Sequence, residues 1–154
     1  MFQKITFTKH PPAKPTLIWD GTCGFCKWWK IRWETKTGDR IHFVPYQDVA
    51  QDFPDIPIKE FKKASRLIEP DGKIYSGPDS AYRSLYYTGN KKWHHWYEKY
   101  SWFESLCDLA YNHIAKNRSI YFKLTKFLFG KDPHQPKLYW FYYILILLAI
   151  ILLL

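Results

Sequence analysis

The first apolar run of the chain is a predicted strand, and a predicted helix follows it within a few residues. Residues 16–19 are rich in β-formers and are followed by the turn residues Asp20 and Gly21, which is typical of a buried strand. Aromatic side chains then recur at helical spacing over residues 25–33, and Gly38 ends this stretch. A strand that leads directly into a helix favours an α/β fold.

The later elements continue this alternation. The sequence predicts a second strand at 41–44, a mixture of loop and helix at 47–64, a hairpin with arms at 66–68 and 73–75, a helix over 78–85, and one long amphipathic helix, or two with a break near Asn117, over 106–128. Residues 90–105 match no single pattern. The order of elements predicts an α/β domain with a small mixed sheet flanked by helices.

The length and composition limit the class of protein. A chain of 154 residues suits one domain with an appendage and can bury a core without disulfide staples. Its three cysteines also argue against a disulfide-stapled secreted scaffold, in which even numbers are usual. Aromatic residues make up 20% of the chain, which excludes disorder for most of it. Residues 1–15 are polar and proline-rich, so we expect an N-terminal arm and no secretory signal peptide.

The last 17 residues, 138–154, contain no charged residue, glycine or proline. Five aromatic residues at 139–143 precede a purely aliphatic stretch, which is the order expected of a helix whose rings lie at the headgroup level of a bilayer. A helix of this length would rise about 25 Å, at the short end of the range for a bilayer crossing. We therefore expect 138–154 to form a C-terminal membrane helix in contact with membrane lipid. Burial in the domain core and insertion into one leaflet are the alternatives.

Basic residues determine the expected orientation and the interpretation of the net charge. Lys131 and Lys137 lie in a linker, 131–137, that precedes the apolar segment, and nothing basic follows. The positive-inside tendency therefore predicts a single-pass membrane protein with its folded domain on the cytoplasmic side. The net charge of +9 is spread along the chain, which argues against nucleic acid as a partner. The basic excess over 106–137 favours attraction to anionic lipid, with an ordinary solvated helix face as the alternative.

A Cys-x-x-Cys motif lies at the expected junction between the first strand and the first helix. Cys23 would occupy the helix N-terminus, where free N–H groups and the helix dipole favour a thiolate. Cys26 is one turn further on, from where its thiol can attack a mixed disulfide formed at Cys23. The spacing therefore predicts an attacking thiol at Cys23 and a resolving thiol at Cys26. Asp20 is the third candidate catalytic residue, either through an Asx-type bond to the loop or through proton transfer to Cys26.

Zinc sites also use paired cysteines, so a metal-binding module is an alternative interpretation of the motif. Two further ligands would then be needed, and the candidates are His94, His95, Cys107 and His113. The sequence contains no second Cys-x-x-Cys and no histidine pair at the usual spacing, so we assign no metal ligand. For Cys107, a buried and unreactive thiol on the apolar side of its helix is the favoured interpretation.

Asp20, Cys23 and Cys26 match the D-x-x-C-x-x-C signature of the DCC family of thiol-disulfide oxidoreductases, which the chain resembles. The resemblance continues at residues 43–47, at 71–77 with Ala81, and at Tyr111 with 114–118. These motifs occur in the family's order and together span about residues 16–130. The resemblance implies a thioredoxin-like fold and dithiol–disulfide exchange. In one departure, Ala64 and Ser65 precede the strand at Arg66, where thioredoxin-like redox proteins usually carry a cis-proline.

Residue chemistry and resemblance together predict a thioredoxin-like domain over 16–130 that acts as a membrane-tethered protein-disulfide reductase. The dithiol of Cys23 and Cys26, supported by Asp20, would exchange with disulfides of proteins or small-molecule thiols. No cofactor is expected. The alternatives are the metal-binding module and a membrane-anchored interaction domain without enzymatic activity.

Overall fold

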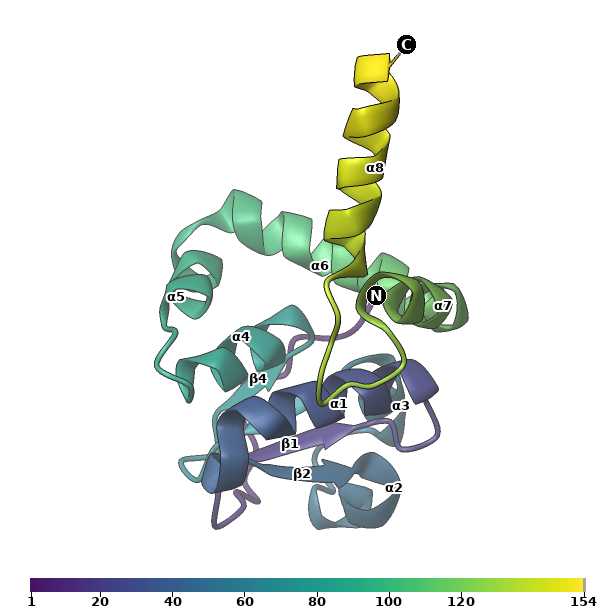
Figure 1. Cartoon of the computed structure of the whole chain (residues 1–154). Helices are drawn as coiled ribbons and strands as arrows, with labels where there is room; N and C mark the ends of the chain where they lie inside the picture. The colour runs from purple at the N-terminus through teal and green to yellow at the C-terminus, as the bar shows by residue number, and fades with distance from the viewer. Residues whose placement is uncertain (154) are drawn as a thin grey trace.

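The sheet at the centre of the molecule has four strands in the order β2-β1-β3-β4. In this computed structural model, which describes residues 1–153, the strands are β1 (Thr16–Trp19), β2 (His42–Pro45), β3 (Arg66–Ile68) and β4 (Ile74–Ser76). β1 runs parallel to β2 and antiparallel to β3, which pairs antiparallel with β4. A mixed sheet of this order with helices around it (Figure 1) fits the expected thioredoxin-like fold, and the predicted strand regions are confirmed.

Helices lie on both faces of the sheet. Within residues 1–153 they are α1 (Gly24–Thr37), α2 (Tyr46–Val49), α3 (Ile58–Lys63), α4 (Pro78–Tyr86), α5 (Lys92–Lys99), α6 (Ser101–Lys116), α7 (Arg118–Phe129) and α8 (Tyr139–Leu153). Alternate strand residues bury opposite faces, as the two-residue period of a strand requires. Ile18 and Ile68 belong to a core completed by Phe61 of α3, whereas Leu17 and Leu67 belong to a second core that contacts Trp33 of α1.

The predicted amphipathic stretch forms two helices, α6 and α7, which meet at Asn117. Asn117 leaves the helical region, with φ −122° and ψ 33°, and therefore ends α6 and caps α7. α7 packs against α1 (Figure 1). In this contact the Phe129 ring lies 6.2 Å from that of Trp28 and 6.3 Å from that of Trp29. This packing holds the first residue of α7, Arg118, close to the start of α1.

The N-terminal segment runs along β4. The Ile74 amide donates to the Thr6 carbonyl at 2.9 Å, and the Thr8 amide donates to the Gly72 carbonyl at 2.9 Å. The Phe2 side chain is buried and meets the ring of Tyr111 edge-on at 5.5 Å. These contacts tie the first eight residues to the sheet and to α6.

The predicted membrane-spanning helix over 138–154, and with it the single-pass cytoplasmic-side topology, is wrong. Over residues 1–153, no helix has the length and apolar character needed to cross a bilayer. α8 has 15 residues and so rises about 22 Å, compared with a hydrocarbon core of about 30 Å. One of the rings expected at the headgroup level instead packs on the protein, because Tyr143 stacks on Phe127 of α7 at 4.6 Å. Beyond this contact α8 projects from the domain (Figure 1). Leu154 lies outside the described residues.

Candidate active site

The Cys-x-x-Cys pair lies where β1 ends and α1 begins. Cys23 caps α1 with extended backbone angles, φ −90° and ψ 109°, and its sulfur accepts a hydrogen bond from the Cys26 amide at 3.2 Å. The Cys23 amide in turn donates to the Asp20 carbonyl at 3.1 Å. The sequence placed Cys23 at a helix N-terminus, and the structure confirms this position.

The surroundings of Cys23 favour its thiolate. Hydrogen bonds from the Cys26 thiol and amide, together with the positive charge of Arg118, lower the pKa of Cys23 from 9.0 to about 6, although partial burial opposes the shift. A thiol with this pKa is about nine-tenths ionised at about pH 7. The lowered pKa therefore favours the thiolate form of Cys23 at neutral pH.

The surroundings of Cys26 favour its protonated form. Its pKa is raised, first because its thiol hydrogen-bonds to Cys23, and then because it is more buried and faces the negative charge of the Cys23 thiolate. Both cysteines are free thiols in this structure. The pair is therefore a reduced dithiol in which one proton is held on the inner sulfur.

Asp20 is the hydrogen-bonding centre of the loop. Its Oδ1 accepts from the Thr22 amide at 3.2 Å, from the Thr22 hydroxyl at 2.8 Å and from Gln47 Nε2 at 3.1 Å. The first of these is the predicted Asx-type bond. Burial opposes ionisation of Asp20, but these hydrogen bonds and the charge of Arg118 outweigh it and lower the pKa of the carboxyl group. A carboxylate held in this state is a weak proton acceptor.

Arg118 connects α7 to the dithiol loop. Its Nη1 donates to Asp20 Oδ2 at 3.0 Å, and its Nη2 donates to the carbonyls of Lys62 at 2.9 Å and Lys63 at 3.3 Å, beside the end of α3. Burial lowers the pKa of Arg118, but its electrostatic interactions with the cysteine pair, and then with Asp20, outweigh this effect and raise it. A guanidinium with fixed partners on two sides provides a permanent positive charge beside the two sulfurs.

The segment before β3 forms another wall of the site. The Ser65 amide donates to the Tyr111 hydroxyl at 3.1 Å, and the Ser65 hydroxyl lies 2.8 Å from that of Ser80. Ala64 and Ser65, at the position where proline was absent from the sequence, line the same cavity as Cys26. Tyr111 thus links this wall to α6, the helix to which it belongs.

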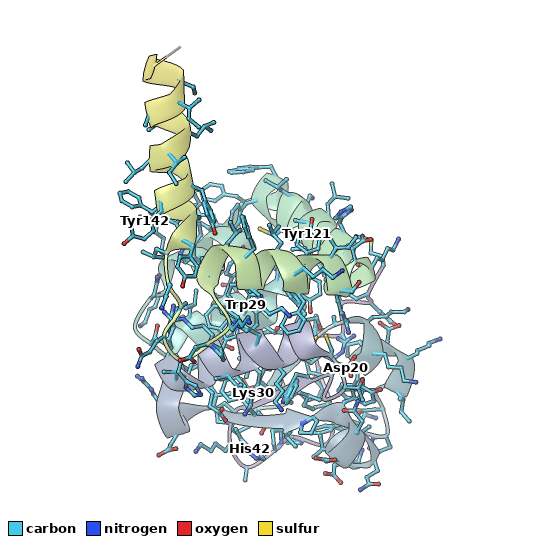
Figure 2. All side chains as sticks on the ribbon, turned by 45° about the vertical axis from the view of Figure 1, so that its right-hand side comes forward. Asp20, Trp29, Lys30, His42, Tyr121 and Tyr142 are labelled. Atoms are coloured by element: carbon cyan, nitrogen blue, oxygen red, sulfur yellow. The ribbon has the colours of Figure 1, made fainter. Side chains whose placement is uncertain are left out.

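A cavity of about 590 Å³ opens beside Cys26. Its lining comes mainly from β1, α1, α4 and α6 and includes the aromatic side chains of Phe25, Trp29 and Trp33. Figure 2 shows Trp29 on the side of α1 that faces α7, and Asp20 near the beginning of α1. The site therefore combines a polar dithiol loop with an adjoining apolar cavity.

Comparison with known families agrees with this geometry. A family model described as DCC1-like thiol-disulfide oxidoreductase matches residues 17–124. The chain belongs to this family. Searches of curated proteins and of solved structures found no match. The match to the DCC1-like family extends from β1 into α7 and thus includes the cysteine pair, Asp20 and Arg118.

Sequence reasoning assigned no role to several DCC1-like residues that the structure brings to the dithiol. Gln47, Tyr111 and Arg118 are part of the resemblance, but their positions 21 or more residues from Cys26 give no indication that Gln47 and Arg118 bond to Asp20 or that Tyr111 bonds to Ser65. The family motifs themselves were the only signal, because each of these residues lies within one. Ser65 had no such signal beyond the missing proline.

The residues considered for zinc do not assemble with the cysteine pair. Over the described part of the chain, no three His, Cys, Asp or Glu side chains form a group that could hold a metal. His94 is buried and pairs with Asp79 at 2.9 Å, and Cys107 lies 3.2 Å from the Tyr82 hydroxyl while lining the cavity. The metal-binding alternative therefore lacks the ligand set that it requires.

Proposed function

We propose that the protein catalyses thiol–disulfide exchange through the dithiol of Cys23 and Cys26. The proposal rests on the opposite pKa shifts of two thiols one helical turn apart, lowered to about 6 at Cys23 and raised at Cys26. The thiolate is the reactive form in disulfide exchange. A dithiol with one ionised and one protonated sulfur has a defined nucleophile and a defined resolving group. Membership of the family supports the same class of reaction.

The first step is attack by the Cys23 thiolate on one sulfur of a substrate disulfide. A bond forms between Cys23 and that sulfur, the substrate S–S bond breaks, and the departing thiolate takes a proton from water. Cys26 then gives its proton to the hydroxide left by that water and attacks the Cys23 sulfur, which forms the Cys23–Cys26 disulfide and releases the second substrate thiolate. The substrate gains two electrons and the dithiol loses two. A dithiol reductant returns the protein to its starting state.

Asp20 and Arg118 act in this proposal as positioning residues. Asp20 holds the loop through Thr22 and Gln47, and Arg118 supplies the positive charge that favours the Cys23 thiolate. The lowered pKa of Asp20 makes it a poor acceptor for the Cys26 proton, so we assign it no proton transfer. The substrates are disulfides of proteins or small-molecule thiols.

The test is reduction of insulin disulfides by the full chain with dithiothreitol as the reductant, in wild type, Cys23→Ser and Cys26→Ser. We expect wild type to accelerate the reaction and Cys23→Ser to be inactive. In a separate reaction from which dithiothreitol has been removed, reduced Cys26→Ser should accumulate a mixed disulfide with the substrate, which intact-mass spectrometry detects. Activity that persists in Cys23→Ser would refute the assignment, provided that circular dichroism shows all three proteins to be folded.

A further inference from the structure

The cavity beside the dithiol has a lining that does not suit a charged ligand. Asp20, Lys30 and Arg118 are the charged residues of its lining, and each already has an ionic partner: Asp20 pairs with Arg118, and Lys30 pairs with Glu34 at 2.7 Å. The remaining lining consists mostly of aromatic and aliphatic side chains. Its volume of about 590 Å³ lies within the usual range of about 300–1,000 Å³ for small-molecule sites.

Small residues opposite large rings keep the cavity open. Ala81 of α4 and Ala110 of α6 face it together with Trp29 and Trp33 of α1. Protein interiors are normally filled at crystal-like density, so an apolar hollow of this size between helices is unusual for a region that only stabilises the fold. Exposed apolar surface that is concave and contiguous is typical of a ligand site.

The cavity is lined in part by Cys26, the inner cysteine of the dithiol. Cys26 belongs to the lining, whereas Cys23 is not among the described residues that form it. In disulfide exchange, the attacking sulfur approaches in line with the bond that breaks. When Cys26 attacks a mixed disulfide at Cys23, the departing substrate sulfur therefore lies on the side of Cys23 away from Cys26. The cavity thus opens on a different side of the dithiol from the leaving substrate, and it gives a second molecule access to Cys26.

The lining also restricts which two-electron carriers could occupy the cavity. Flavin and nicotinamide cofactors carry phosphates, and glutathione carries several charges, whereas the charged lining residues are already paired. Aromatic side chains favour a flat ring with which they can stack. One polar group suits a carbonyl oxygen: the Tyr82 hydroxyl lines the cavity, and its partner there is the sulfur of Cys107 at 3.2 Å, which is a weak acceptor. Burial, followed by the hydrogen bond to Cys107, raises the pKa of Tyr82. The hydroxyl therefore stays protonated and can donate a hydrogen bond to a carbonyl oxygen.

We infer that this cavity binds a quinone, which exchanges electrons with the dithiol at Cys26. The inference rests on the proposed redox function and identifies the second reactant. In the oxidising direction, the Cys23 thiolate and the Cys26 thiol give up two electrons as the S–S bond forms. The quinone takes up these electrons together with the Cys26 proton and one proton from water, and becomes the hydroquinone. The reverse reaction reduces the Cys23–Cys26 disulfide and regenerates the quinone.

Binding is tested separately from electron transfer. The probe is ubiquinone-1, because its ring is fully substituted and resists addition of thiols. Its dissociation constant is measured by tryptophan fluorescence on the Cys23→Ser/Cys26→Ser double variant, which cannot react. Ala110→Trp in this background narrows the cavity, and Leu109→Trp, on the 68% exposed neighbouring position of the same helix, is the matched control. We expect binding by the parent and by the Leu109→Trp protein, and at least about tenfold weaker binding after Ala110→Trp or Tyr82→Phe.

Electron transfer from the dithiol to ubiquinone-1 is then measured under anaerobic conditions. The reduced wild type and ubiquinone-1 should form hydroquinone and the Cys23–Cys26 disulfide in equal amounts, and Cys26→Ser should not. Exchange of the wild type with glutathione disulfide is measured in parallel and tests the proposed function alone. Exchange without quinone binding would overturn the quinone inference and leave the proposed function intact. Quinone binding without exchange would overturn the proposed function, and with it electron transfer to the quinone, and would leave only the assignment of the cavity as a quinone-binding site. Tight, cavity-dependent binding of lipoamide in place of the quinone would overturn the choice of an aromatic ring.

Discussion

Asp20 and Arg118 stand 98 positions apart in the chain, and their side chains meet at 3.0 Å beside the dithiol. The pair joins the loop before α1 to the first residue of α7. Because Arg118 also donates to the Lys62 and Lys63 carbonyls, it is fixed from a second direction. The two members of the pair have opposite effects on Cys23, since the charge of Arg118 lowers the pKa of that thiol and the charge of Asp20 raises it.

Replacement of Arg118 should weaken the thiolate. Arg118→Met removes a positive charge from the Cys23 sulfur, so we expect the pKa of Cys23 to rise and its rate of alkylation at about pH 6 to fall about threefold or more. The measurement is the pH profile of iodoacetamide alkylation, with peptide mass spectrometry to report on Cys23 alone. Arg40→Met, which removes a surface arginine remote from the loop, is the control and should keep the wild-type profile. An unchanged profile for Arg118→Met would contradict this electrostatic role.

Replacement of Asp20 should have the opposite sign. Asp20→Asn keeps an oxygen that can accept from Thr22 but removes the negative charge, while the Lys62 and Lys63 carbonyls still hold Arg118. We therefore expect the pKa of Cys23 to fall below about 6 and alkylation at about pH 5 to become faster. A slower reaction would show that the ion pair is needed to keep Arg118 in place.

The thiolate should also couple folding stability to pH. The pKa of Cys23 is about 6 in the folded protein and 9.0 in an ordinary thiol, so the unfolded chain binds one more proton between these values. Stability of the reduced protein therefore gains from Cys23 as pH rises from about 6 to 9, and loses this contribution as pH falls through 6. Cys26, with its raised pKa, acts in the opposite direction only above about pH 9.

Urea unfolding of the reduced protein at about pH 6 and about pH 8 measures this coupling. The difference between the two pH values should be more positive in wild type than in Cys23→Ser, because the variant lacks the ionised sulfur. Comparison of the two proteins cancels the contributions of other titrating groups. Equal differences would mean that Cys23 has the same pKa in the folded and unfolded chains.

Gly24 of α1 lies against the Phe122 ring of α7. A Cβ atom at this position would lie 3.0 Å from the Phe122 ring, which is closer than ordinary contact. Gly24→Val should therefore displace α7, lower the free energy of unfolding by about 1–3 kcal/mol and raise the pKa of Cys23 as Arg118 moves. Lys27→Val, on the exposed side of α1, shows the cost of a β-branched residue alone. If both variants have the same Cys23 pKa, the packing of α7 does not control the thiol.

Gly77 and Gly89 separate backbone strain from steric overlap. Both have positive φ, +61° and +91°, but a Cβ at Gly77 would lie 2.7 Å from the Phe2 ring, whereas the space around Gly89 is open. We expect Gly89→Ala to destabilise the protein by about 1–2 kcal/mol through strain, and Gly77→Ala by about 1–3 kcal/mol more through overlap. Thermal unfolding gives the comparison. Equal losses of stability in the two variants would indicate that Phe2 moves away from residue 77 without destabilising the protein.

Local signals predicted the part of the site that is local in sequence. The β-formers before Asp20, the aromatic spacing after it and Gly38 fix β1 and α1, and these two elements place Cys23 at the helix cap. The sequence similarly offers, as one of two alternatives, a break near Asn117 that divides the amphipathic stretch into two helices. Arg118 could not be placed, because its position depends on how α7 packs against α1 across the fold. α5 had no single pattern, because buried His94 and Tyr97 stand beside the partly exposed Trp93.

The C-terminal helix shows the limit of composition as a guide. The apolar segment was counted from Leu138, but α8 begins at Tyr139, and its Tyr143 is used in a contact with α7. The cavity beside Cys26 was equally invisible, because it arises from the spacing between α1, α4 and α6 and not from any one segment.

The separation of Asp20 and Arg118 by 98 positions also affects the order in which the site is completed during synthesis. A ribosome adds the cysteine pair to the growing chain long before it adds Arg118. Until α7 has been synthesised and has docked on α1, the Cys23 sulfur lacks that cation and is a weaker nucleophile. The share of the lowered Cys23 pKa that comes from Arg118 is therefore gained only when α7 is in place.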